Sequence, residues 1–135
     1  MKQPLAYVHP EAQIADNVVI EPFVTIDKNV VIEEGTRIGS NVTILEGARI
    51  GGEKSIVVIG DNTTIRECAT INRGTAAKGI TKVGNNCLIM AYVHIAHDCE
   101  IGDNCIITNA CQLAGEVVVD DFAIIGGMSA VHQFV

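Results

Sequence analysis

The chain repeats a six-residue unit along almost its whole length, and this period restricts the folds open to it. An aliphatic residue returns every sixth position in three runs: Val8, Ile14, Ile20, Ile26, Ile32, Ile38, Ile44 and Ile50; Ile59, Ile65 and Ile71; and Val83, Ile89, Ile95, Ile101, Ile107, Leu113, Val119, Ile125 and Val131. A period of six matches neither an amphipathic helix nor an alternating strand. It predicts an all-β parallel β-helix, in which the chain turns a corner every six residues and three sides close one triangular coil of eighteen. About seven coils fit this length, stacked ~4.8 Å apart.

A second inward position is expected four residues after each aliphatic one, and it must hold a small side chain. The residues found there are Val18, Val24, Val30, Val42, Ala48, Thr63, Ala69, Cys87, Cys99, Cys105 and Cys111. The buried position accounts for these cysteines as small core residues, without a disulfide scaffold, a zinc site or redox chemistry. Cys68 stands one place earlier and is predicted at a corner. Reduced cysteines favour a cytoplasmic location.

Composition supports one domain over residues 1–135. Hydrophobic residues make up 48% of the chain but aromatic residues only 4%, so branched aliphatic side chains must fill the core. The net charge of −7 argues against a nucleic-acid partner. No apolar run has the length of a signal peptide core or a membrane span, so neither is expected.

Two segments, residues 51–58 and 72–82, interrupt the period and are candidate binding elements. The second carries Arg73, Lys78 and Lys82, and it contains no acidic residue. Such a basic segment in an acidic protein can meet an anionic ligand or partner, or it can be a solvated loop.

Polar residues from three coils are predicted to converge on one strip of the surface. The inward residues Ile95, Leu113 and Val131 are spaced by eighteen and therefore stack on one side. The strip around them consists of His94, His97 and Asp98 in the first of these coils, Gly115 and Glu116 in the second, and His132 and Gln133 in the third. None stands at an inward position, so all are expected to be accessible to solvent or ligand.

This strip has the residues needed for acyl transfer to a hydroxyl group. A neutral histidine beside a carboxylate acts as a general base, and Asp98 or Glu116 can supply that carboxylate. A glycine such as Gly115 leaves its N–H open to a developing oxyanion. No serine or cysteine lies in the strip, which favours direct attack by the substrate hydroxyl over a covalent enzyme intermediate.

Two other interpretations of the strip remain open. Polar corner residues are ordinary in such repeats and can be neutral to function. Three histidines could also bind zinc, as in the hexapeptide-repeat carbonic anhydrases, although His94 and His97 are spaced more tightly than that family's metal pair. We expect no metal and no cofactor.

Three segments carry a closer resemblance to a known family. They are residues 71–75 (INRGT), 95–99 (IAHDC) and 120–134 (DDFAIIGGMSAVHQF), within a match that runs from Val8 to the last residue. Together they resemble the acyl-carrier-protein–UDP-N-acetylglucosamine O-acyltransferases of lipid A biosynthesis. Single hexads are shared by many transferases, whereas the last segment is long and specific.

The resemblance implies a left-handed parallel β-helix that assembles as a homotrimer. It implies transfer of a 3-hydroxyacyl chain from acyl carrier protein to the glucosamine 3-hydroxyl of UDP-N-acetylglucosamine, between adjacent subunits. His97 matches the catalytic base, Asp98 its partner and Gly115 the oxyanion donor. The positions that match substrate contacts are His94, His132 and Gln133, and we add Arg73 and Glu116 as substrate-binding candidates.

The chain also departs from the family pattern. Glu116 stands where many members carry a histidine, and segment 51–58 is shorter and lacks an Asp-Leu-Lys stretch. The sequence stops at Val135, so the family's further coils and C-terminal helical domain are absent from it. Two alternatives follow, namely a catalytically silent repeat module and the related N-acyltransferase, which uses an amine acceptor.

Overall fold

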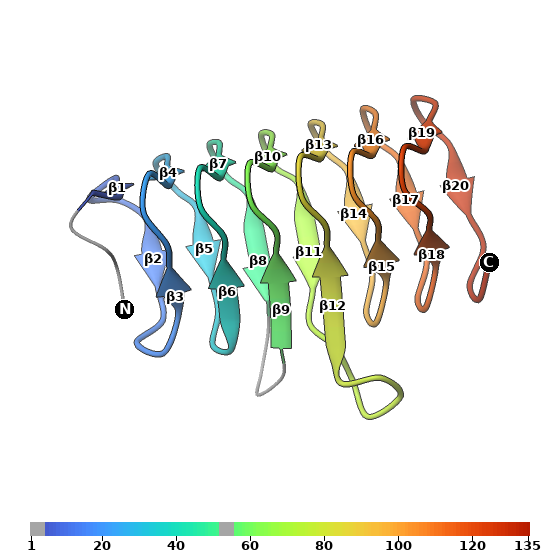
Figure 1. Cartoon of the computed structure of the whole chain (residues 1–135), viewed down its shortest axis with the longest axis horizontal. Coiled ribbons are helices and arrows are strands. Elements are labelled where there is room, and N and C mark those ends of the chain that lie inside the picture. The colour runs from blue at the N-terminus through green and yellow to red at the C-terminus, as the bar shows by residue number, and fades with distance from the viewer. Residues whose placement is uncertain (1–4, 52–55) are drawn as a thin grey trace.

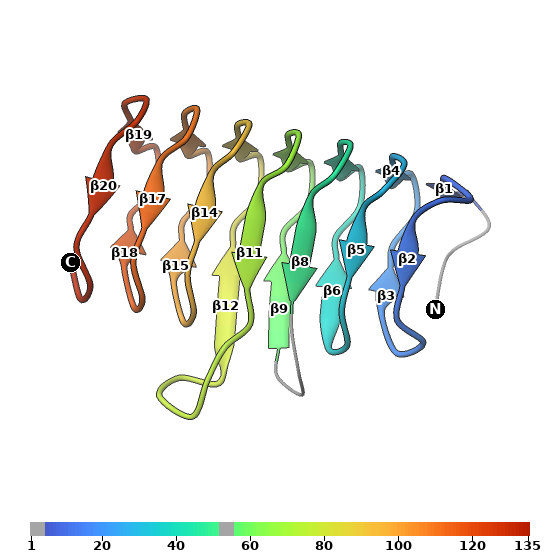
Figure 2. The same ribbon diagram turned by 180° about the vertical axis from the view of Figure 1, so that it is seen from behind.

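The chain winds into a parallel β-helix, shown here by a computed structural model that describes residues 5–51 and 56–135. In Figure 1 the chain advances from the N-terminal end at the left to the C-terminal end at the right. It descends along the strands at the back and rises along those at the front, and Figure 2 gives the same path from behind. This winding is left-handed, opposite to the usual right-handed crossover between parallel strands. The predicted fold class is therefore confirmed.

Three parallel sheets form the sides of the prism. The first contains β1 (Tyr7–Val8), β4 (Thr25–Ile26), β7 (Thr43–Ile44), β10 (Thr64–Ile65), β13 (Leu88–Ile89), β16 (Ile106–Ile107) and β19 (Ile124–Ile125). The second contains β2 (Gln13–Ile14), β5 (Val31–Ile32), β8 (Arg49–Gly51), β11 (Thr70–Asn72), β14 (His94–Ile95), β17 (Gln112–Leu113) and β20 (Ala130–Val131). The third contains β3 (Val19–Ile20), β6 (Thr36–Ile38), β9 (Ile56–Ile59), β12 (Ile80–Val83), β15 (Glu100–Ile101) and β18 (Val118–Val119).

The core is a set of vertical stacks of aliphatic side chains. Each strand places its repeat aliphatic residue inward, in register with the equivalent residue of the next coil, as Ile71, Ile95 and Leu113 are. These three are at most 1% exposed, and burial of one isoleucine contributes ~1.5–3 kcal/mol. The four predicted inward cysteines are buried as well, whereas Cys68 lies exposed at a corner, as expected.

One corner, after the strands of the third sheet, explains why glycine often follows the aliphatic residue. There an Asp or Asn side chain accepts a hydrogen bond from a backbone N–H one coil earlier, over 2.7–2.9 Å. The acceptors are Asp61, Asn85, Asp103 and Asp121, and the donors are Ser40, Asp61, Asn85 and Asp103. A Cβ on the glycine before each donor (Gly39, Gly60, Gly84 or Gly102) would overlap the accepting carboxylate or amide oxygen. We call this row the corner ladder.

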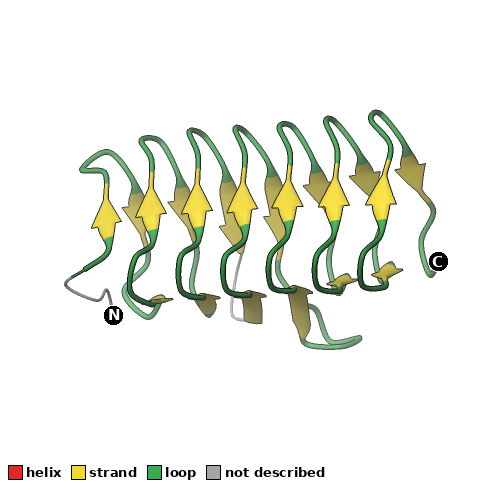
Figure 3. Cartoon of the chain, turned by 45° about the horizontal axis from the view of Figure 1, so that its top comes forward, coloured by secondary structure: helices red, strands yellow, loops and turns green. Residues whose placement is uncertain are grey.

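The two interruptions lie on adjacent coils and both lead into longer strands of the third sheet. Within segment 51–58, residues 52–55 lie outside the described residues, and β9 begins at Ile56. Within segment 72–82 the chain leaves the prism after β11 and returns at β12, whose four residues pair with those of β9. This excursion, residues 73–79, is the loop that projects below the prism in Figure 3. The described residues contain no helix, hence none that could span a membrane.

Candidate active site

The corner that follows the second sheet brings residues from three coils into one row. Because Ile95, Leu113 and Val131 stack in register, the residues two places after them occupy equivalent positions. These are His97, Gly115 and Gln133, in that order along the prism. Arg73 follows Ile71 by the same two places, but it is the first residue of the loop 73–79, which leaves the prism there.

His97 and Asp98 form a hydrogen-bonded pair at this corner. The imidazole Nδ1 lies 2.9 Å from Asp98 Oδ2, and the His97 side chain is 39% exposed while that of Asp98 is fully buried. The Asp98 backbone N–H also donates to Thr81 Oγ1 over 2.9 Å. One imidazole edge is therefore fixed from inside the protein, and the other is left for a ligand.

The prediction that every residue of the strip is accessible is wrong for Gly115, which is buried, and for Asp98. Its side chain is covered by Thr75, whose backbone N–H donates to Asp98 Oδ1 over 2.8 Å and whose hydroxyl donates to Oδ2. Thr75 belongs to the loop 73–79, whose path the six-residue period does not determine. The loop closes over a position that would otherwise face solvent.

Asp98 stays ionised although it is buried. Burial by itself raises the pKa of this carboxyl, but the hydrogen bonds from the Thr75 hydroxyl, the Thr75 N–H and His97 outweigh it and lower the pKa to about 2. An ionised carboxylate only accepts hydrogen bonds, so His97 Nδ1 must carry a proton toward it. In the neutral imidazole, Nε2 is then unprotonated and can accept a proton.

Gly115 lies directly against the reactive edge of His97. A Cβ at position 115 would overlap Nε2 and Cε1 of the His97 ring, so only glycine permits this approach. The Gly115 carbonyl accepts from the Phe134 N–H over 3.2 Å, and within the described residues no hydrogen bond engages the Gly115 N–H. An unengaged N–H on a residue that lies against the His97 ring is a suitable donor to an oxyanion.

His94 sits on the outer face of the second sheet. Its Nδ1 lies 2.6 Å from Thr70 Oγ1 on the neighbouring strand β11, and burial lowers the pKa of His94, which favours the neutral ring at pH 7. Gln112 pairs with it in register on β17.

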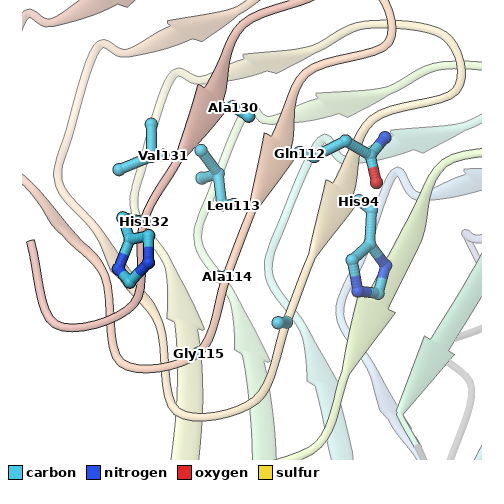
Figure 4. A pocket seen from close by; sticks show the side chains of 9 residues that line it. His94, Gln112, Leu113, Ala114, Gly115, Ala130, Val131 and His132 are labelled. Atoms are coloured by element: carbon cyan, nitrogen blue, oxygen red, sulfur yellow. The ribbon is translucent and has the colours of Figure 1, made fainter.

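A pocket of about 580 Å³ opens between these coils. It is lined by His94, Ala96, Gln112, Leu113, Ala114, Gly115, Ala130, Val131 and His132. Figure 4 shows the His94 and His132 rings on opposite sides of the segment that runs from Leu113 to Gly115. His97 and Asp98 are not among the lining residues; the pair flanks the pocket, next to Ala96 and Gly115.

The remaining predicted residues lie around this pocket with different exposure. His132 is exposed and lines it, whereas Gln133, Glu116 and Arg73 are half-buried outside it. Glu116 is tied to the His97 segment through its backbone, since its N–H donates to the His97 carbonyl over 2.9 Å. Within the described part of the chain, no three His, Cys, Asp or Glu side chains are grouped as metal ligands would be.

Sequence reasoning missed several residues of the site. Gln112 follows His94 by eighteen positions, so the coil arithmetic contained the signal for it. Thr75 and Thr81 carried no such signal, because they belong to the irregular loop and to the strand that follows it.

Comparisons with known proteins identify the repeat and the proteins that the chain resembles. A family model described as the GMPPB C-terminal domain matches residues 2–80, and one described as bacterial transferase hexapeptide (six repeats) matches residues 80–111. The acyl-[acyl-carrier-protein]–UDP-N-acetylglucosamine O-acyltransferase of Verminephrobacter eiseniae is 54% identical over 85 residues, which are 62% of this chain and 32% of the relative. The corresponding enzyme of Campylobacter concisus is 52% identical over 80 residues, or 58% of this chain and 30% of that protein.

The backbone also superposes on solved structures of UDP-N-acetylglucosamine acyltransferases. The UDP-N-acetylglucosamine acyltransferase from Bacteroides fragilis superposes with a TM-score of 0.75 and 49% identity, covering 99% of this chain and 61% of that one. The UDP-N-acetylglucosamine acyltransferase from Campylobacter jejuni superposes with a TM-score of 0.77 and 40% identity, covering 95% of this chain and 61% of that one. The chain therefore spans about three fifths of these solved proteins, and the sequence matches span about a third of the curated relatives. The chain belongs to the family of the GMPPB C-terminal domain and is a hexapeptide-repeat protein similar over nearly its whole length to the UDP-N-acetylglucosamine acyltransferases.

Proposed function

We propose that this protein is an O-acyltransferase of the first step of lipid A biosynthesis. It would move a 3-hydroxyacyl chain from acyl carrier protein to the glucosamine 3-hydroxyl of UDP-N-acetylglucosamine, the substrates in the names of its relatives. One observation carries the proposal. His97 is held at Nδ1 by a buried, ionised Asp98, while its Nε2 lies against Gly115 beside an open pocket.

The reaction needs a base, an oxyanion donor and a good leaving group. His97 Nε2 removes the proton of the sugar hydroxyl, and Asp98 stabilises the imidazolium that forms. The hydroxyl oxygen attacks the thioester carbonyl, and the Gly115 N–H stabilises the negative charge on the carbonyl oxygen. The C–S bond then breaks, and the carrier thiolate leaves readily because a thiol pKa is near 8.5.

Substrate contacts are assigned to the residues around this centre. His94, His132 and Gln133 would contact the sugar and the acyl group, with Glu116 at the edge of the row. Arg73 and the loop behind it, which carries Lys78, would meet the phosphate groups of the sugar nucleotide or the acidic carrier protein. We expect neither a metal nor another cofactor in this chemistry.

We further propose one repeat domain over residues 1–135, a homotrimer and a cytoplasmic location. Large apolar side chains support assembly, because Tyr92, Phe122, Ile124 and Met128 are at least 65% exposed, and such residues are commonly covered by a neighbouring chain. The cytoplasm supplies the carrier thioester and keeps the free cysteines reduced.

The experiment is a transfer assay on purified chain with 3-hydroxyacyl carrier protein and UDP-N-acetylglucosamine. His97→Ala should lower kcat by at least about 100-fold while the chain stays folded. His9→Ala removes an imidazole at another corner, where the ring accepts from the Glu11 N–H, and should keep full activity. Activity of His97→Ala within tenfold of wild type would refute the assignment of the base. Transfer only to an amine acceptor, or none by the wild-type chain, would refute the proposed function of this chain.

A further inference from the structure

We propose that Thr75 is a positioning residue for the His97–Asp98 pair, and that the loop 73–79 serves to bring it there. This inference rests on the proposed role of His97 as the base. The second interruption of the repeat, segment 72–82, would then help to orient the base. This role is separate from any contact between its basic residues and a substrate.

Thr75 fixes the orientation of the Asp98 carboxylate through two hydrogen bonds. Its N–H holds Oδ1, and its hydroxyl holds Oδ2, the oxygen that also faces His97 Nδ1. With both oxygens engaged, the carboxylate cannot rotate without breaking at least one of these bonds. The atom that defines the tautomer of His97 is therefore positioned by the loop.

The direction of the Thr75 hydroxyl proton follows from its neighbours. The Ala77 N–H donates to Thr75 Oγ1 over 3.3 Å, so that oxygen already serves as an acceptor on one side. Asp98 is ionised and can only accept, so the single hydroxyl proton must point at Oδ2.

The loop itself is closed tightly at its base, so Thr75 is held in place. The Gly79 N–H donates to the Thr75 carbonyl over 2.6 Å, and a Cβ at Gly74 would overlap the backbone of Gly79 and Ile80. The strand that follows then supplies Thr81, which accepts from the Asp98 N–H. Both ends of the excursion are thus attached to Asp98.

The test compares Thr75→Val, Thr75→Ser and Thr43→Val. Valine has nearly the shape of threonine but lacks the hydroxyl, serine keeps the hydroxyl, and Thr43 is half-buried on the first sheet, away from the site. Thr75→Val should lower kcat by about 10- to 100-fold with little change in KM, because the base is misoriented while binding is retained. Thr75→Ser should recover kcat to within about threefold of wild type, and Thr43→Val should match wild type.

A second measurement separates this inference from the assignment of the reaction. Nitrogen-15 NMR of the imidazole reports which ring nitrogen carries the proton, whether or not the chain turns over substrate. In wild type the His97 signal should be that of the Nδ1–H tautomer, and Thr75→Val should shift it toward Nε2–H, the form preferred by a histidine side chain free in water. Unchanged kcat and an unchanged tautomer in Thr75→Val would overturn the proposal. Loss of kcat in Thr75→Ser equal to that in Thr75→Val would also overturn it, since the hydroxyl would then not be the group that matters.

Discussion

Asp98 is the only charged side chain among the fully buried residues of the described chain. A lone buried carboxylate would be neutralised by a rise in its pKa. Here the rise is outweighed, because Thr75 and His97 together supply three hydrogen bonds to the two carboxylate oxygens. Asp98 therefore keeps its negative charge beside His97 and can polarise the ring. Its burial also excludes water that would compete for the same hydrogen bonds.

Gly115 is the residue whose substitution most directly tests how His97 is placed. Gly115→Ala should lower transfer activity by about 100-fold, because the added methyl group overlaps the imidazole and must push Nε2 away from its position. The measurement is kcat/KM in the transfer assay, with the melting temperature recorded to show that the chain still folds.

Gly127 provides the matched control, since it also stands two places after a repeat aliphatic residue. A Cβ there would meet the Asn109 carbonyl oxygen at 3.6 Å, an ordinary contact. Gly127→Ala should therefore keep the activity of wild type. Equal activity of the two alanine variants would show that His97 does not depend on the space at position 115.

At the scale of the element, the corner ladder shows how glycine and Asp or Asn cooperate between coils. A short side chain from one coil satisfies a backbone N–H of the coil before it, and a glycine beside that N–H leaves the necessary room. Asn residues that follow, such as Asn86 and Asn104, adopt positive φ, which this residue type tolerates well. The corner is thus encoded by a few residue types at fixed spacing.

Gly84→Ala is predicted to destabilise the chain, by roughly 2 kcal/mol or more, because its Cβ would overlap the Asp103 carboxylate and the Gly102 carbonyl of the next coil. Gly126 is also the first residue after a repeat aliphatic residue, but its Cβ would meet only Ser129 Oγ at 3.9 Å. Gly126→Ala should therefore leave the free energy of unfolding, measured in urea, within about 0.5 kcal/mol of wild type. A similar loss in both variants would show that the ladder does not set the requirement for glycine.

The elements also show what a sequence of this kind reveals and what it hides. The six-residue period located the strands outside the two interruptions, because each side of the coil must bury one aliphatic residue, and the spacing of eighteen agrees with the register of β14, β17 and β20. The same arithmetic could not foresee the burial of Asp98. That burial depends on the loop 73–79, whose path is determined by its own contacts at Gly74, Thr75 and Gly79.

Across the whole molecule, charge is divided unevenly between the two ends of the prism. All nine basic residues lie at or before Lys82, while Glu100, Asp103, Glu116, Asp120 and Asp121 follow without a basic neighbour in sequence. The described ion pairs between Lys or Arg and a carboxylate accordingly involve only residues up to Glu67. The loop 73–79 and the row that contains His97 lie where these two regions meet.

The cysteines allow the integrity of the entire prism to be followed in solution. Cys87, Cys99, Cys105 and Cys111 are at most 3% exposed, and the thiol of each lies 3.0–3.1 Å from a carbonyl oxygen of the next coil. Burial raises the pKa of Cys87 and Cys99, which further reduces the fraction of reactive thiolate. A thiol reagent should therefore label one residue, Cys68, rapidly in the folded chain and all five after unfolding in denaturant.

The variant Cys68→Ser separates this prediction from slow opening of the prism. It should show no rapid phase, and the four remaining thiols should react together only as the coils that bury them open. These coils also carry His97 and Gly115, so the rate at which the coils open limits how long these two residues stay together. Rapid labelling of a second thiol in folded Cys68→Ser would mean that the coils between Val83 and Val119 do not close around the core as the register of β12 to β18 requires.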